Sequence, residues 1–332
     1  MARSTSPKLA VPDAPVNGVN SAATTGRATG VLARRPGLSN LLISLRPDQW
    51  TKNLLVFAAL VFARKLFDLA SVAAALEAFV IFCFLSGVVY LVNDVMDRDS
   101  DRRHPLKSRR PVAAGELPVA TALTAAGLLC AVSLAAAFAL GWKFAAVASV
   151  YVALQMLYSG PLKHLVILDV LTVALGFVLR AVAGAVAIDV LISRWLFVCT
   201  ILLALFIALA KRRHELVLLG DDASSHRAIL GEYSPYLLDQ MIVVVAASTL
   251  ISYIFYSISD DTAARFDTEW LGLTIPFPLY GIFRYLYLVH RREGGGSPSD
   301  LLLNDRPMLA CVTLWIIAVV LIIYRPWVLE GR

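Results

Sequence analysis

Long apolar stretches separated by short polar connections make up most of the chain after residue 50. A transmembrane helix needs about 20 mainly apolar residues, and nine stretches approach that length. They cover residues 50–65, 70–95, 119–140, 143–159, 166–189, 194–212, 236–258, 271–290 and 307–324. The first and fourth are short or interrupted. The pattern predicts an all-α integral membrane protein, a bundle of nine transmembrane helices.

The N-terminal region has a different composition. Residues 1–37 are rich in Ser, Pro, Ala, Gly and Thr, show no helical periodicity and lack the continuous apolar core of a signal peptide. We expect a disordered cytoplasmic tail there, followed by one membrane domain over residues 38–332. Residues 38–48 predict an interfacial helix that leads into the first apolar stretch.

Lys and Arg are concentrated on alternate connections. The connection between the second and third stretches holds Arg98, Arg102, Arg103, Lys107, Arg109 and Arg110. The largest connection on the opposite side, residues 259–270, holds Asp260, Asp261, Asp267 and Glu269. Because cytoplasmic connections carry the excess of Lys and Arg, the N-terminus is predicted to be cytoplasmic. The connection after the second stretch then lies at the cytoplasmic surface.

The composition agrees with a membrane protein. The 332 residues are 58% hydrophobic and 16% charged, whereas about a quarter of the residues in a soluble domain are charged. The net charge of +6 relates first to topology and anionic lipids, and no nucleic-acid partner is expected. The four cysteines lie in apolar runs without CxxC pairing, so neither a disulfide framework nor a zinc site is predicted.

An acidic cluster, NDVMDRDSD, follows the second apolar stretch directly. On a helix, Asn93, Asp97 and Asp101 are spaced four apart and share a face, with Asp94 about one turn from Asp97. Mg²⁺ prefers such oxygen ligands and keeps open positions for a substrate phosphate. The alternative is a solvated helix end that happens to be acidic.

Basic residues come immediately after the cluster, in RRHPLKSRRPVAAG. Cations so close to acidic residues suit a polyanion, because a metal can bridge some phosphate oxygens while Arg and Lys neutralise others. Lys107 and Arg110 are candidates for this role. The alternative is that these cations only enforce the orientation of the chain.

A second polar cluster enters the fifth stretch and consists of Tyr158, Lys163, Asp169 and Arg180. Asp169 and Arg180 are eleven residues apart, close to three helical turns, so they share one face. Ionisable residues inside a membrane usually face a cavity and mark a function. A structural link between an Asp and an Arg on different helices is the alternative, and Arg284 in the eighth stretch raises the same question.

Further candidates lie at other helix ends. Lys211 and Arg212 end the sixth stretch and either bind phosphate or act as a stop signal. The segment RPDQWTKN contributes Arg46, Lys52 and Asn53 near the N-terminus. Tyr90 lies one turn before the acidic cluster and is expected to direct its hydroxyl to the same pocket.

The sequence contains no Ser-His-Asp spacing, no P-loop and no HExxH motif. An obvious general base is also missing. This fits a reaction in which metal and cations stabilise a departing pyrophosphate and the nucleophile is already ionised.

The chain resembles the UbiA superfamily of intramembrane prenyltransferases, which have nine transmembrane helices and an NDxxDxxxD motif at the cytoplasmic end of the second. The motif is matched here by Asn93, Asp94, Asp97 and Asp101. The resemblance covers residues 40–325. The most similar branch consists of phosphoribosyltransferases of actinobacterial cell-wall synthesis. The features that point to this branch are RPDQWTKN, YLVNDVMDRDSDRRHPLKSRRPVAAG, the pair Tyr158 and Lys163, FVLRAVAG and KRRHEL.

One departure from the superfamily bears on the donor. Members that use prenyl diphosphates carry a second acidic motif after the fourth helix, where this chain has YSGPLKHLVILDVLTV with the single acid Asp169. The resemblance therefore implies transfer of 5-phosphoribose from phosphoribosyl pyrophosphate (PRPP) to a polyprenyl (decaprenyl) phosphate, for cell-wall arabinan precursors. It also implies a plasma-membrane enzyme whose active site is at the cytoplasmic face.

The resemblance also implies roles for the candidate residues. Mg²⁺, with Mn²⁺ as an alternative, is expected on Asn93, Asp94, Asp97 and Asp101. The catalytic set is expected to be Asp94, Asp97, Asp101 and Lys163. The substrate-binding set is expected to be Lys52, Tyr90, Lys107, Arg110, Tyr158, Lys163, Arg180, Lys211 and Arg212. Within it, Lys107, Arg110 and Lys163 are assigned to PRPP phosphates, Tyr90 and Tyr158 to the sugar, and Lys52 and Arg180 to the lipid phosphate or a shared anionic centre.

Two alternatives remain open from the sequence. An aromatic prenyltransferase of quinone or haem synthesis would share the fold but needs a second acidic motif. A transporter or lipid-binding protein would distribute its ionisable residues around a midplane path. The oligomeric state is open, and a homo-oligomer is compatible with the sequence.

Overall fold

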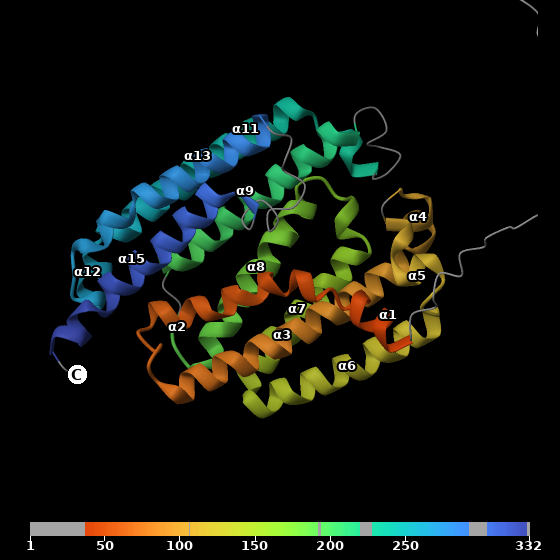
Figure 1. The fold of residues 1–332 in the computed structure, drawn as a ribbon, viewed down its shortest axis with the longest axis horizontal. Coiled ribbons are helices and arrows are strands. Elements are labelled where there is room, and N and C mark those ends of the chain that lie inside the picture. Colours follow the sequence, from red (N-terminus) through yellow and green to blue (C-terminus); the bar gives the residue numbers. More distant parts are fainter. Residues whose placement is uncertain (1–36, 106, 192–193, 220–227, 292–303, 331–332) are drawn as a thin grey trace, which may run out of the picture. The chain divides into compact units, whose positions relative to one another are not determined.

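The computed structural model of the protein describes residues 37–105, 107–191, 194–219, 228–291 and 304–330. Within these ranges the regular secondary structure is helical and no strand occurs, as Figure 1 shows. The long helices are α3 (Leu69–Met96), α6 (Val119–Leu140), α7 (Trp142–Ser159), α8 (Leu168–Ala187), α9 (Arg194–Leu219), α11 (Pro235–Ile258), α13 (Pro276–Arg291) and α15 (Arg306–Glu330). The short ones are α1 (Gly37–Ser44), α2 (Ala58–Phe62), α4 (Arg98–Arg103), α5 (Pro111–Ala114) and α12 (Asp260–Phe266). The 3-10 helices are η1 (Pro47–Phe57), η2 (Lys107–Arg109), η3 (Leu162–His164), η5 (Ala228–Glu232) and η6 (Trp270–Thr274).

Local sequence explains where several helices begin and end. The first N–H groups of a helix lack partners inside the helix, and a preceding Asp or Ser can accept from them. The Asp68 carboxylate accepts from the N–H of Ala70 at 3.3 Å before α3, and the Ser234 hydroxyl accepts from Leu237 before α11. Gly115, with a φ of 79°, ends α5 in a left-handed conformation that glycine adopts readily.

Each of the nine predicted stretches overlaps helical backbone, which confirms the all-α class. Five described helices are long and apolar enough to cross a membrane: α3, α6, α8, α11 and the part Arg306–Arg325 of α15. The count of nine spans and the cytoplasmic N-terminus stay predictions. Residues 1–36 lie outside the described residues, so the tail stays a prediction as well.

The first predicted stretch, residues 50–65, differs from the expectation of one continuous helix. Most of it is the 3-10 helix η1, followed by the five-residue α2. Runs of 3-10 helix longer than three or four residues are uncommon, because their hydrogen-bond geometry is poorer than that of an α-helix. The predicted interfacial helix 38–48 corresponds to α1, which ends at Ser44 before Arg46 adopts a positive φ of 51° ahead of Pro47.

Two hydrophobic clusters hold the long helices together, and α8 belongs to both. In the first, Phe82 of α3 packs with Tyr151 of α7, the ring centroids 5.1 Å apart, and Ala183 of α8 lies among them. In the second, Val170 of α8 packs with residues of α9, α11 and α13. Helix α8 contacts both α7 and α9 and lies between them in Figure 1. Its polar side chains, Asp169 and Arg180, are therefore enclosed by several helices.

A glycine allows η1 to approach α8 closely. A Cβ atom added at Gly184 would overlap the carbonyl oxygen of Val56, whose side chain is fully buried. This approach brings the Asn53 side chain of η1 to 2.7 Å from the Arg180 guanidinium. The packing of η1 on α8 thus places polar residues from two distant segments in one location.

Candidate active site

The acidic cluster lies at the junction of α3 and α4. Helix α3 ends at Met96, Asp97 occupies the position between the helices, and Asp101 belongs to α4. The N–H groups of Asp97 and Asp101 donate to the carbonyl oxygens four residues earlier, at 2.8 Å each. The predicted four-residue spacing of Asn93, Asp97 and Asp101 is therefore kept across the junction.

Every carboxylate of the predicted metal set contacts a cation from elsewhere in the chain. Arg110 donates to Asp94 at 3.2 Å and to Asp101 at 2.6 Å. Lys163 of η3 donates to Asp97 at 2.7 Å. Charge-assisted hydrogen bonds of this kind are short and strong. The structure thus joins the acidic cluster, the basic segment after it and the second polar cluster in one site.

Arg46 is a member of this site for which the sequence predicted no role. Its guanidinium donates to Asp94, and it stacks over the Tyr90 ring at 4.8 Å from the centroid. Asp94 is only 1% exposed, so its charge depends on the two guanidiniums beside it. The signal for Arg46 was its position in a polar segment, RPDQWTKN, immediately before an apolar stretch.

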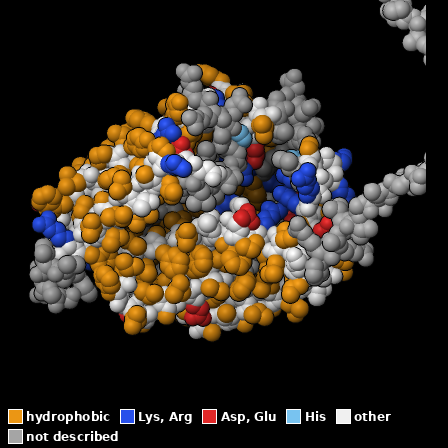
Figure 2. Space-filling model, in the orientation of Figure 1, with side chains coloured by type: hydrophobic (Ala, Val, Ile, Leu, Met, Phe, Trp, Pro, Cys, Tyr) orange, Lys and Arg blue, Asp and Glu red, His pale blue; other side chains and the backbone are white. Residues whose placement is uncertain are grey.

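A second group of cations surrounds Lys52 of η1. The Lys52 ammonium group lies within electrostatic range of three other cations, Lys211, Arg180 and Arg46, and of one carboxylate, Asp48. None of the described acidic side chains forms a salt bridge with Lys52, and Lys211 has only Glu215 at 3.9 Å. Figure 2 shows Lys and Arg side chains gathered, with acidic ones among them, around a hollow beside α4.

The buried guanidinium of Arg180 has neutral partners. It donates to Asn53 at 2.7 Å, to the Tyr151 hydroxyl at 2.8 Å and to the carbonyl oxygen of Gly176 at 2.8 Å. No carboxylate of the described residues pairs with it. A buried charge without a counter-ion is costly, so this position attracts an anion.

Asp169 has a structural partner on another helix, as one reading of the sequence expected. Its carboxylate is fully buried, and it accepts from Arg212 of α9 at 2.6 Å and from the Tyr233 hydroxyl at 2.9 Å. Burial raises the pKa of Tyr233 to about 12, so the hydroxyl stays protonated and donates. Tyr158 accepts from Arg212 at 3.1 Å. These contacts tie α7, α8 and α9 together.

The remaining candidates fall into three groups. Arg212 and Tyr158 are brought together in the Asp169 link, and their roles toward substrate stay predictions. Lys107, in η2, and Lys211 are exposed near the site. Arg284 pairs with Asp305 at 2.8 Å and therefore links α13 to the segment before α15.

The oxygen donors fit a metal that is shared with a ligand. In the described residues, no three or more His, Cys, Asp or Glu side chains converge on a position for a metal ion. Mg²⁺ at phosphate sites commonly uses one or two carboxylates together with phosphate and water oxygens. Asp97, partly exposed, and the neighbouring Asn93 suit such a shared site better than a cage built by protein alone.

The model of the UbiA prenyltransferase family matches residues 54–304. The chain belongs to this family. Among curated UbiA relatives, decaprenyl-phosphate phosphoribosyltransferase of Mycolicibacterium smegmatis is 37% identical over 292 residues, covering 84% of this chain and 91% of the relative. The protein of the same name from Corynebacterium glutamicum is 34% identical and covers 86% of each chain.

Solved structures agree on the fold. A UbiA homolog from Archaeoglobus fulgidus, bound to GPP and Mg²⁺, superimposes with a TM-score of 0.68 at 22% identity, covering 86% of this chain and 99% of that one. The UbiA fold and the apolar helices make this chain an integral membrane protein. The family resemblance expected from the NDxxDxxxD motif is confirmed.

Proposed function

We propose that this UbiA-family protein transfers 5-phosphoribose from PRPP to decaprenyl phosphate or a similar polyprenyl phosphate and releases pyrophosphate. The observation that carries the proposal is the contact of Lys163 with Asp97 at 2.7 Å. Lys163 lies in the segment after the fourth predicted helix, where enzymes that use prenyl diphosphates have further carboxylates. The curated relatives named for this reaction support the same reading.

The donor is expected to bind at the acidic cluster. Asn93 and Asp97, with Asp94 or Asp101, would hold Mg²⁺ or Mn²⁺, which supplies positive charge to the leaving pyrophosphate when bound. Arg110, Arg46 and Lys163 already lie against these carboxylates, and each keeps N–H donors for phosphate oxygens. Lys107 is a further candidate for a PRPP phosphate, and Tyr90 for the sugar.

The acceptor phosphate suits the second group of cations. Lys52, Arg180 and Lys211 offer positive charge with one carboxylate contact among them, at 3.9 Å. A polyprenyl phosphate is ionised at neutral pH, so its oxygen needs no general base. That oxygen forms the new bond to the anomeric carbon of the sugar while the bond to pyrophosphate breaks, and pyrophosphate leaves with the electron pair. Positioning and charge stabilisation are the main contributions of the protein.

The location of the reaction belongs to the same proposal. A cytoplasmic site in the plasma membrane gives access to soluble PRPP, while the lipid tail stays in the bilayer because of its apolar surface. The nine-helix topology with a cytoplasmic N-terminus is consistent with this arrangement.

The test is a transfer assay with purified protein, labelled PRPP, Mg²⁺ and decaprenyl phosphate. Label should appear in the lipid phase, and should not appear when the metal is chelated or the acceptor omitted. No transfer, together with activity on a prenyl diphosphate and an aromatic acid, would contradict the proposal and favour an aromatic prenyltransferase.

A further inference from the structure

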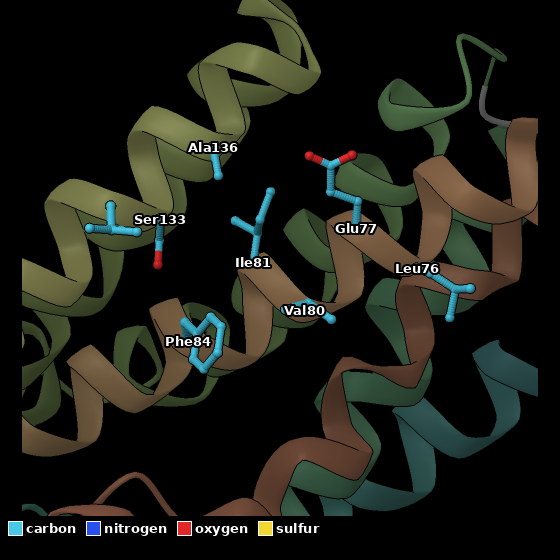
Figure 3. Close-up of a pocket in the computed structure, with 8 residues that line it drawn as sticks. Leu76, Glu77, Val80, Ile81, Phe84, Ser133 and Ala136 are labelled. Atoms are coloured by element: carbon cyan, nitrogen blue, oxygen red, sulfur yellow. The ribbon is translucent and has the colours of Figure 1, made fainter.

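A small groove lies between α3 and α6, far from the candidate active site. It has a volume of about 350 Å³ and is lined by Leu76, Glu77, Val80, Ile81, Phe84, Val132, Ser133 and Ala136 (Figure 3). Glu77 precedes Asn93 by sixteen residues on the same helix, which corresponds to about 24 Å along the axis. The groove therefore belongs to the opposite half of the membrane domain.

The groove faces the bilayer. Leu76, Val80 and Val132 on its rim are exposed apolar side chains on helices long enough to cross a membrane. Figure 2 shows the face over α3 and α6 covered mainly by hydrophobic side chains. An apolar ligand that reaches the groove can therefore arrive from the lipid phase.

Two polar groups interrupt this apolar lining and lack partners. The Ser133 hydroxyl is buried, with the residue 3% exposed, and forms no hydrogen bond. Glu77 has no salt bridge or hydrogen bond to a described residue, and both side chains line the same groove in Figure 3. Buried polar groups are nearly always satisfied, so the unpartnered Ser133 hydroxyl indicates a missing ligand. The Glu77 carboxylate is exposed and unpaired, so it offers a negative charge to a ligand in the same groove.

The depth of Glu77 suits a lipid headgroup. Helix α3 has 28 residues, about 42 Å, whereas the hydrocarbon core is about 30 Å thick. A centred α3 extends about 6 Å beyond the core at each end, and Glu77 lies about 12 Å from its start. The Glu77 carboxylate is then a few ångströms below the headgroup level, which a long side chain can reach.

From these observations we infer that the groove binds a phospholipid with a primary ammonium headgroup, in the leaflet opposite to the acidic cluster. The ammonium group donates to the Glu77 carboxylate, the Ser133 hydroxyl donates to a glycerol ester oxygen, and part of an acyl chain covers Ile81 and Phe84. Small-ligand sites have this character, mostly apolar with a few placed polar groups. The charge complementarity selects an ammonium lipid over an anionic one.

The experiment compares lipids that remain on the purified full-length protein, measured by native mass spectrometry after exchange into mixed-lipid nanodiscs. Wild-type protein should retain phosphatidylethanolamine in preference to phosphatidylcholine, whose choline group is cationic but has no N–H donor, and to phosphatidylglycerol, which is anionic. Glu77→Gln should lower the retention of phosphatidylethanolamine about tenfold, as expected for loss of a charged hydrogen bond. Ser133→Ala should lower it less.

The matched control is Glu269→Gln, which converts an exposed carboxylate outside the groove and should leave retention unchanged. The thermal midpoints of all variants in phosphatidylcholine alone should equal that of wild type, which excludes a folding defect. Equal preference among the three lipids, or an unchanged preference in Glu77→Gln, would overturn the inference. A shift from dimer to monomer in Glu77→Gln without any effect on lipid retention would overturn it too, because the occupant would be a second copy of the chain.

Discussion

At the scale of single residues, the site is defined by which cation meets which carboxylate. Arg110 contacts two acids of the motif, Asp94 and Asp101, whereas Lys163 contacts Asp97 alone. Asp94 and Asp101 are almost fully buried, so neither carboxylate can bind a metal or substrate unless Arg110 moves away. Asp97 is the most accessible of the three and is the best candidate for direct contact with a metal-bound diphosphate.

Asp97→Ala tests this assignment. We expect transfer activity to fall by about a hundredfold or more, as for loss of a group that stabilises charge in the transition state. The thermal midpoint should change little, because the Asp97 side chain is partly exposed. Retained Mg²⁺-dependent activity would remove Asp97 from the metal set.

Lys163→Ala tests whether Lys163 binds the donor, PRPP, and not the acceptor, the polyprenyl phosphate. Loss of a charged hydrogen bond corresponds to about 1.5–3 kcal/mol, so the KM for PRPP should rise about ten- to a hundredfold. The KM for the polyprenyl phosphate should stay nearly constant. Steady-state kinetics with each substrate varied in turn will show this, and equal losses for both substrates would contradict the assigned role.

At the scale of elements, α8 organises the molecule. It contributes Asp169 to the link with α9, Arg180 to the cationic group, and Gly184 to the contact with η1. Each of these depends on a neighbour that is distant in sequence. Changes on α8 should therefore affect stability first and chemistry second.

Asp169→Ala should destabilise the protein strongly. It leaves the Arg212 guanidinium buried with only part of its partners, and removal of one member of a buried ion pair costs about 3–5 kcal/mol. Thermal unfolding in nanodiscs measures the loss. The control is Asp99→Ala, whose side chain is 90% exposed and which should have little effect. A midpoint equal to that of the control would show that the buried link contributes nothing.

Gly184→Ala tests the close approach of η1 to α8. The added methyl group overlaps the backbone of Val56, so η1 must move, at a cost at the upper end of about 1–3 kcal/mol. Gly127→Ala is a matched control, since a Cβ atom there meets nothing within 4 Å. The control should be neutral or slightly stabilising because alanine favours the helix. Similar midpoints for the two variants would argue against this packing.

At the scale of the whole molecule, one end of the helices differs in character from the other. The paired acids and bases gather at the junction of α3 and α4, whereas the groove with Glu77 lies toward the start of α3. This polarity suits an enzyme that takes a soluble donor from one side only. It does not suit a transport path with ionisable residues near the midplane.

The predicted orientation can be tested by cysteine labelling in a variant that lacks the native cysteines. Ser100→Cys, at an exposed position in α4, should react with an impermeant maleimide only in inverted vesicles. Asp261→Cys, exposed in α12, should react only in right-side-out vesicles. The reverse pattern, or labelling of both residues from one side, would exclude the cytoplasmic location of the acidic cluster.

Much of the fold was predictable because it is encoded locally. Apolar run lengths predicted the helices, and the four-residue spacing of Asn93, Asp97 and Asp101 held across a helix junction. The first stretch was less predictable, because the contact of η1 with α8 at Gly184 lies more than a hundred residues away in sequence. Arg46 escaped assignment for the same reason, since its partner Asp94 is 48 residues further on.

The sequence alone determined that the protein is a helical membrane protein with the acidic motif of the UbiA family, because hydropathy, charge bias and motif spacing act over short distances along the chain. Only the tertiary structure decided how the charges combine. Lys163 meets Asp97 across 66 residues, and Arg180 meets Asn53 across 127. Such pairings depend on the order and contact of packed helices, which no local pattern encodes. They distinguish a site of paired charges from a row of acidic residues.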